Sequence, residues 1–209
     1  MRITELSLVP IYLGHRPGLF EFLGARLAAI FDAPVHVHHP WFDPERSFDP
    51  DRSQYNSTRL LTSLLAHPPA EDGAKILGVT GVDLFVPVLT YVFGEAELGG
   101  RAAVVSLHRL CPEAYGLPPD PVLLGERLLK EAVHELGHTL GLTHCQDSTC
   151  VMHPTTYAEE IDLKSAAFCP ACRDPAGLGR GHRSAGQPPP EPSPAGPSPA
   201  RPPLPFART

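Results

Sequence analysis

The spacing of apolar residues along the chain changes between a period of two and a period of about 3.6, which predicts strands alternating with helices. The expected elements are strands over residues 3 to 9, 35 to 39, 76 to 85, 90 to 93 and 102 to 108, and helices over residues 19 to 31 and 55 to 66. The second helix should be capped near Asn56 or Ser57, and the last two strands join across Gly99-Gly100. Together these elements predict an α/β fold with a mixed twisted sheet.

A longer helix should begin at Asp120 and Pro121, because aspartate is a good N-cap and proline fits the first turn. An apolar stripe follows at helical spacing, formed by Leu129, Val133, Leu136 and Leu140. One face of this helix should therefore pack on the core while the opposite face lines a cleft. Gly141 should end the helix, since glycine tolerates the left-handed conformation that a helix exit usually needs.

The composition changes after this helix. Residues 142 to 173 hold four of the five cysteines and few large apolar side chains. Residues 173 to 209 contain 11 of the 26 prolines, and such a segment cannot bury enough apolar surface to fold. We therefore expect one domain over residues 1 to 173, with an upper part to about residue 141 and a smaller C-terminal part over 142 to 173. A disordered proline-rich tail should follow over residues 174 to 209.

Charge and hydropathy bear on the partners. The formal net charge is −6, and the acidic body of the chain argues against nucleic acid as the main partner. The first residues are broken by charge and too short for a signal peptide, and no apolar run approaches the ~18 residues of a membrane helix. We therefore expect a cytoplasmic monomer that binds neither nucleic acid nor a membrane.

The most informative stretch is His134-Glu-Leu-Gly-His-Thr-Leu-Gly-Leu-Thr-His144. Two histidines four apart lie only ~40° apart around a helix, so His134 and His138 can bind the same zinc ion. Beyond the turn at Gly141, His144 can supply a third ligand, which leaves the fourth position for water and substrate. Glu135 can then act as general base on that water, as in zinc peptidases. The alternative is that these histidines only form hydrogen bonds on a core helix, which is disfavoured because the motif with its glycine and third histidine rarely arises by chance.

A second metal site is indicated by Cys145, Cys150, Cys169 and Cys172, the last two spaced as C-x-x-C. Four thiolates close a tetrahedron around a structural zinc. The alternative is two disulfides, which require an oxidising compartment. Cys111 is left over as a buried or free thiol. The histidines between residues 36 and 39 could suggest another metal, but alternate histidines in a short strand are more often half-exposed.

The extended histidine motif with a downstream methionine resembles the metzincin clan of zinc peptidases. The cysteine pattern resembles one branch, the archaemetzincins, as do four upstream runs: Asp51-Arg-Ser-Gln-Tyr-Asn-Ser-Thr58, Gly78-Val-Thr-Gly-Val-Asp-Leu-Phe85, Tyr91-Val-Phe-Gly-Glu-Ala96 and Val105-Ser-Leu-His-Arg-Leu110. This resemblance covers about residues 1 to 173. It implies a metzincin-like catalytic domain with an active-site helix and a small zinc-bound C-terminal segment.

The resemblance also implies that Met152 forms a methionine turn beneath the catalytic metal, and that substrate lies antiparallel to an edge strand, here expected over residues 102 to 108. Pro154 stands where some metzincins carry a metal-proximal tyrosine, which leaves Tyr157 as the candidate for stabilising an oxyanion. Between Met152 and Cys169 the chain has 16 residues, one fewer than the family pattern.

We therefore expect a zinc metallopeptidase with two zinc ions, one catalytic and one structural, that hydrolyses short or extended peptides. The alternative is a catalytically quiet, zinc-stabilised module that binds peptides or proteins. A third interpretation is a metalloregulator that senses metal through the cysteine thiolates, but the sequence carries no DNA-binding motif to support it.

Overall fold

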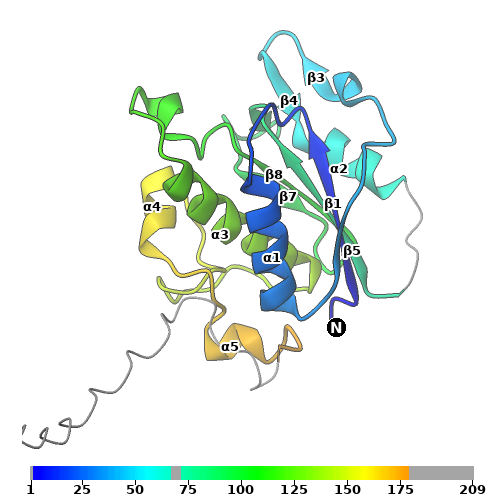
Figure 1. Cartoon of the computed structure of the whole chain (residues 1–209), viewed down its shortest axis with the longest axis vertical. Helices are drawn as coiled ribbons and strands as arrows, with labels where there is room; N and C mark the ends of the chain where they lie inside the picture. Colours follow the sequence, from blue (N-terminus) through cyan, green and yellow to red (C-terminus); the bar gives the residue numbers. More distant parts are fainter. Residues whose placement is uncertain (1, 67–71, 179–209) are drawn as a thin grey trace, which may run out of the picture.

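A computed structural model of the chain, shown in Figure 1, describes residues 2–66 and 72–178. Its centre is a five-stranded sheet with the strand order β2-β1-β5-β8-β7. The strands are β1 (Glu5–Ile11), β2 (Val35–Val37), β5 (Ala74–Thr80), β7 (Gly94–Ala96) and β8 (Ala102–Ser106). The first four strands in this order are parallel, and β7 pairs antiparallel with β8 at the edge. The predicted α/β fold with a mixed sheet is confirmed.

Helices cover both faces of this sheet. α1 (Leu19–Phe31) and α3 (Pro121–Thr139) lie on one face, and α2 (Ser57–Leu65) lies on the other. The alternation of side chains along β1 explains both cores, because Leu6 and Leu8 join the cluster under α1 and α3 while Val9 and Ile11 join the cluster under α2. The result is a three-layer sandwich.

Several predicted elements are confirmed, and the helix over residues 19 to 31 has the predicted bounds. Asn56 caps α2, since its side chain accepts a hydrogen bond of 3.0 Å from the Arg59 N–H. The strand predicted over residues 76 to 85 is instead two strands, because the chain leaves the sheet at Gly81. A Cβ there would lie 2.6 Å from the Tyr12 carbonyl oxygen, so only glycine allows this close approach.

A small second sheet forms beyond that turn. It consists of β3 (Phe48–Asp49), β4 (Gln54–Asn56) and β6 (Leu84–Phe85), in the order β3-β4-β6, and the short helix η1 (Pro44–Ser47) precedes it. Residues 42 to 54, for which the apolar pattern predicts no helix or strand, therefore contain regular structure. A further short helix, η2 (Pro112–Tyr115), lies before α3.

The edge of the main sheet differs from the prediction in one way that matters for function. The strand over residues 102 to 108 was expected at the edge, but β8 lies between β5 and β7. The edge strand is β7, at residues 94–96 rather than the predicted 90 to 93. Strand order is set by tertiary pairing, which the apolar pattern of a single strand does not reveal.

The C-terminal segment shares the main core. It contains α4 (Ala158–Leu163) and α5 (Pro170–Arg173), and Met152 and Ile161 are fully buried in the same cluster as α1 and α3. The packed chain also continues past Arg173, because Ala176 and Leu178 are buried there. Ala176 and Leu178, which follow the boundary expected at residue 173, therefore pack with the core of the domain. The rest of the predicted tail, residues 179–209, is outside the described part of the chain.

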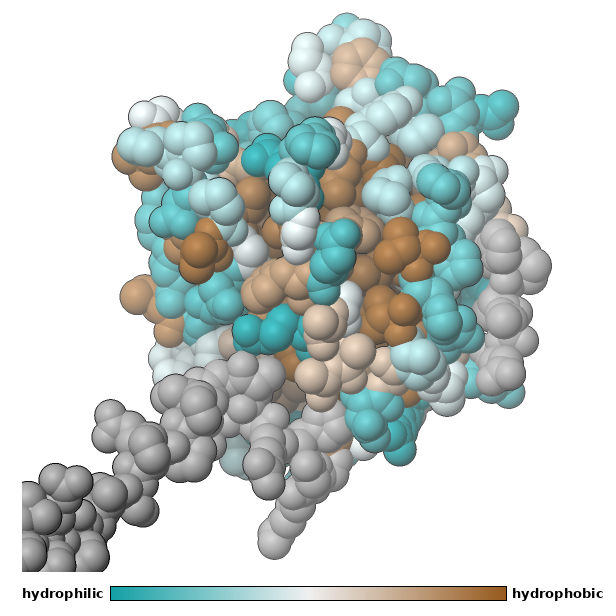
Figure 2. All heavy atoms as spheres, in the orientation of Figure 1, coloured by the Kyte–Doolittle hydropathy of each residue, from teal (hydrophilic) through white to brown (hydrophobic). Residues whose placement is uncertain are grey.

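The face that carries α1 and α3 is covered mainly by hydrophilic side chains, with hydrophobic ones showing between them (Figure 2). Within residues 2–66 and 72–178, no helix combines the length and the apolar character needed to cross a bilayer.

Candidate active site and metal centres

The active-site helix α3 is fixed at both ends by the residues that the sequence singled out. The Asp120 carboxylate accepts hydrogen bonds from the N–H groups of Val122 and Leu123 at 3.1 and 2.9 Å. At the other end Gly141 adopts a φ of 87°, a left-handed conformation that suits glycine. The chain then turns back along the helix, and this reversal brings His144 to the side chains of α3.

The three histidines of the motif converge as predicted. Their rings are 4.7 to 5.4 Å apart between centroids, and one nitrogen from each lies within 4.8 Å of the others. The Nε2 atoms of His134 and His138 are 3.0 Å apart. Three nitrogens bound to a tetrahedral zinc at about 2.0–2.1 Å would be roughly 3.3 Å apart, so the arrangement fits that metal.

Backbone carbonyls orient two of these rings. Nδ1 of His134 lies 2.8 Å from the Val151 oxygen, and Nδ1 of His138 lies 2.8 Å from the Leu142 oxygen. Each contact places the ring proton on Nδ1 and leaves Nε2 free to bind a metal. Burial lowers the pKa of His134 to about 3, and the positive charge of Lys164 acts in the same direction. The ring therefore stays neutral, which is the form that binds zinc.

Glu135 lies between the histidines and the sheet edge, at the floor of a cleft of about 810 Å³. Its carboxylate packs against Gly94 of β7, where an added Cβ would lie only 2.6 Å from Oε1 of Glu135. Burial raises the pKa of Glu135 well above its usual value, and the negative charge of Glu131 adds to this effect. The charge of a bound zinc ion would act in the opposite direction.

Two buried charges beside the site were missed from the sequence. Nζ of Lys164 lies 2.8 Å from Oε1 of Glu131, and both side chains are almost fully buried. Lys164 also donates to the His153 carbonyl at 3.2 Å, so the pair joins α3 to the segment after Met152. Glu131 precedes Glu135 by one helical turn, so the sequence alone places both carboxylates on the same side of the helix. Lys164 carried no sequence signal, because it meets Glu131 only through the fold.

Met152 packs directly against the active-site helix. It is fully buried, and its Sδ and Cε atoms fill the space beside Gly137, where an added Cβ would lie 2.4 Å from Sδ. Gly137 stands between His134 and His138 in the motif, so the methionine supports the backbone that carries both. The place of Met152 beneath a catalytic metal stays a prediction.

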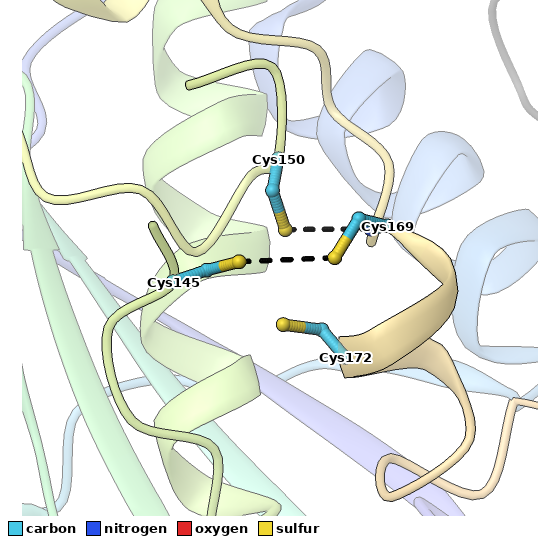
Figure 3. A group of neighbouring side chains, drawn as sticks. All are labelled: Cys145, Cys150, Cys169 and Cys172. Carbon is cyan, nitrogen blue, oxygen red and sulfur yellow. Dashed lines mark hydrogen bonds between the residues drawn. The ribbon is translucent and has the colours of Figure 1, made fainter. Parts of the chain in front are cut away.

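The four cysteines form a second cluster, shown in Figure 3. Their Sγ atoms all lie within 4.8 Å of one another, and those of Cys145 and Cys169 are 3.7 Å apart. A disulfide needs about 2.05 Å, whereas two sulfurs bound to a tetrahedral zinc at about 2.3 Å are roughly 3.8 Å apart. All four thiols are free, so the disulfide alternative is not observed. Burial raises the pKa of Cys150 and Cys172, and a cation between the sulfurs would favour their thiolates.

The two clusters are joined through the backbone. Cys145 follows His144 directly, and its N–H donates to the Met152 carbonyl at 2.9 Å. Ordering the sulfur cluster therefore also fixes His144 and Met152.

Three other residues considered from the sequence, Tyr157, Cys111 and His36, lie outside the two clusters. Tyr157 lines the cleft and is 62% exposed. Cys111 is buried away from the other four cysteines, and His36 lies 3.8 Å from a Glu5 carboxylate oxygen. Among the described residues, the clusters that could hold a metal are the three histidines and the four cysteines.

Comparisons with known proteins agree with this geometry. The family model of peptidase family M54 matches residues 50–175. Archaemetzincin of Methanocaldococcus jannaschii is 48% identical over 129 residues, which cover 62% of this chain and 69% of the relative. Archaemetzincin of Archaeoglobus fulgidus is 41% identical over 152 residues, which cover 73% of this chain and 87% of the relative.

Solved structures of similar proteins extend the match to the fold. The crystal structure of archaemetzincin from Methanopyrus kandleri superposes with a TM-score of 0.71 at 37% identity, covering 82% of this chain and 92% of that one. The Archaeoglobus fulgidus structure, complexed with malonate, gives a TM-score of 0.69 at 37% identity, covering 82% of this chain and 99% of that one. The chain therefore belongs to peptidase family M54, the family of the archaemetzincins, and is a zinc metallopeptidase.

Proposed function

We propose that this peptidase hydrolyses short or extended peptides with Glu135 as the general base. One observation carries the proposal: the Glu135 carboxylate lies in the cleft beside the three histidines, in space that Gly94 leaves open. A glutamate placed there is not needed as a fourth ligand, because the histidines already supply the three protein ligands of an open zinc site.

Zinc held by His134, His138 and His144 would lower the pKa of its bound water and polarise the scissile carbonyl. Glu135 accepts the proton of the attacking water and delivers it to the leaving amine. The phenol of Tyr157, at the rim of the cleft, is the candidate donor to the oxyanion. Met152 keeps the helix backbone in place behind the histidines.

The substrate backbone is proposed to pair with the edge strand β7. Phe93 accepts a hydrogen bond from Ser106 and Glu97 donates one to Ala102, so both face β8. Alternate residues of an antiparallel pair face opposite ways, so the N–H and C=O groups of Gly94 and Ala96 point outward. An extended peptide can take up these groups by strand addition. A folded protein offers no free backbone for this pairing and should be a poor substrate.

The four cysteines are proposed to hold a second, structural zinc. Four sulfurs around one ion leave no open position, so this metal stabilises the segment that carries His144 rather than taking part in hydrolysis. A cytoplasmic location, a monomeric state and the lack of nucleic-acid binding remain predictions.

The alternative function is a catalytically quiet module that binds peptides. The test is incubation of the purified chain with a library of unstructured peptides, with cleavage followed by mass spectrometry. We expect cleavage that a chelator abolishes and added zinc restores. Binding of peptides without any cleavage, in protein with a full zinc content, would favour the alternative.

A further inference from the structure

The two walls of the catalytic cleft are tied together at one end. The upper wall is the segment from Leu89 to Leu98, which includes β7, and the lower wall is the segment from Pro154 to Tyr157. The Tyr91 hydroxyl donates a hydrogen bond of 2.8 Å to the Thr156 carbonyl oxygen. This contact joins residues 65 positions apart in the sequence, and both residues line the cleft.

Other side chains position both partners of this hydrogen bond. The Arg109 guanidinium lies over the Tyr91 ring, 4.7 Å from its centroid, and Arg109 donates to Asp83 from Nε at 2.9 Å. On the lower wall the Thr156 N–H donates to Glu160 at 2.6 Å. Asp83 and Arg109 belong to sequence runs to which the catalytic mechanism assigns no role, and here they position the ring of Tyr91.

The direction of the cleft follows from two contacts. Glu135 lies beside Gly94, and further along the same helix the His138 carbonyl accepts a hydrogen bond of 2.8 Å from the Gly99 N–H. β7 and α3 therefore run past the site in the same direction, and Tyr91 lies at the end where β7 begins. A peptide antiparallel to β7 places the residues that follow its scissile bond at this end.

We propose that Tyr91 is a specificity-determining residue, which limits how far a substrate extends beyond its scissile bond on the C-terminal side. A peptide with a long C-terminal extension must break the bond to Thr156 in order to pass between the walls. One with a short extension fits inside the closed end. This inference rests on the proposed peptidase function and on substrate pairing with β7.

The test uses peptides that share the residues before the scissile bond and differ in the length of the part after it, from one residue to about six. Six residues in extended form span roughly 20 Å. Wild type should show kcat/KM falling as the extension grows. Tyr91→Phe lacks the hydroxyl, and the ratio of kcat/KM for the longest to the shortest peptide should rise about fivefold, the value of one ordinary hydrogen bond. Glu160→Gln, which loosens the hold on Thr156, should change the ratio in the same direction by less.

Tyr115→Phe is the matched control. The Tyr115 hydroxyl donates to the Arg109 carbonyl at 2.9 Å, outside the cleft, so its loss should leave the dependence on length as in wild type. Equal kcat/KM across the series in wild type, or the same decline in wild type and Tyr91→Phe, would overturn the inference while leaving the peptidase function intact. Failure of wild type to cleave any member of the series would overturn both.

Discussion

The position of Glu135 depends on the missing side chain at residue 94, and Gly94→Ala tests this dependence. The added methyl group would lie 2.6 Å from Oε1 and 2.7 Å from Cγ of Glu135, where carbon contacts normally need about 3.5–4.0 Å. It would also lie 2.7 Å from the Val104 backbone oxygen, in the middle of the sheet, which leaves the glutamate as the group that must move. A shift of about 1 Å in a catalytic group can cost ~100-fold in rate.

We therefore expect kcat/KM for peptide hydrolysis to fall by about 100-fold in Gly94→Ala, with a zinc content near that of wild type. Overpacking should also lower the melting temperature by several degrees, from a cost of about 1–3 kcal/mol. Gly24→Ala is the control, because its Cβ would meet Val35 at 3.7 Å and Leu8 at 3.9 Å, which are ordinary contacts. The reasoning is refuted if Gly94→Ala, with full zinc, cleaves peptides as fast as wild type.

Three further predictions concern metal content and stability. Metal analysis should find two zinc ions per wild-type chain and one in Cys169→Ser, which should also melt at a lower temperature; an unchanged zinc content would contradict the four-cysteine site. Ending the chain after Arg173 should lower the melting temperature by several degrees, because this truncation removes the buried Ala176 and Leu178. Ending the chain after Leu178 should leave the melting temperature unchanged. Equal melting temperatures for the two truncations would show that this packing contributes nothing to stability. In metal-free protein, His134 is neutral when folded down to a pKa of about 3 but protonates near pH 6.5 when unfolded, so its contribution to stability should fall as the pH drops below about 6.5, by up to ~1.4 kcal/mol per pH unit. The contribution is measured as the difference in the pH dependence of denaturant melts between wild type and His134→Gln, because the buried Glu135 acts in the opposite direction in both proteins; the same pH dependence in both would contradict it.

The two clusters of candidate metal ligands could be predicted from the sequence because their spacing along the chain is a local feature. The spacing of His134 and His138 fixes their common direction on a helix, and Gly141 fixes where the chain turns back. The C-x-x-C pair can also be recognised within four positions of the chain. Cys169 is the N-cap of the short helix α5, and Cys172 lies within that helix.

What could not be predicted depends on contacts between distant segments. The edge strand was misplaced because strand order is decided by pairing across the sheet, which puts the short, half-buried β7 outside the apolar, fully buried β8. Lys164 gave no signal, since its partner Glu131 is brought to it by the packing of α4 against α3. Gly94 follows the strand predicted over residues 90 to 93, and only the approach of Glu135 shows why a side chain is excluded there.

The central claim is that Glu135 acts as the base while the three histidines alone hold the catalytic metal. The most direct measurement compares wild type with Glu135→Ala, purified in parallel, with zinc content and kcat/KM determined on the same samples. The two proteins should carry the same zinc, since Glu135 is not a ligand, and the variant should lose at least about 100-fold in kcat/KM, the low end for removal of a general base. Equal cleavage by both proteins at equal zinc would contradict the claim.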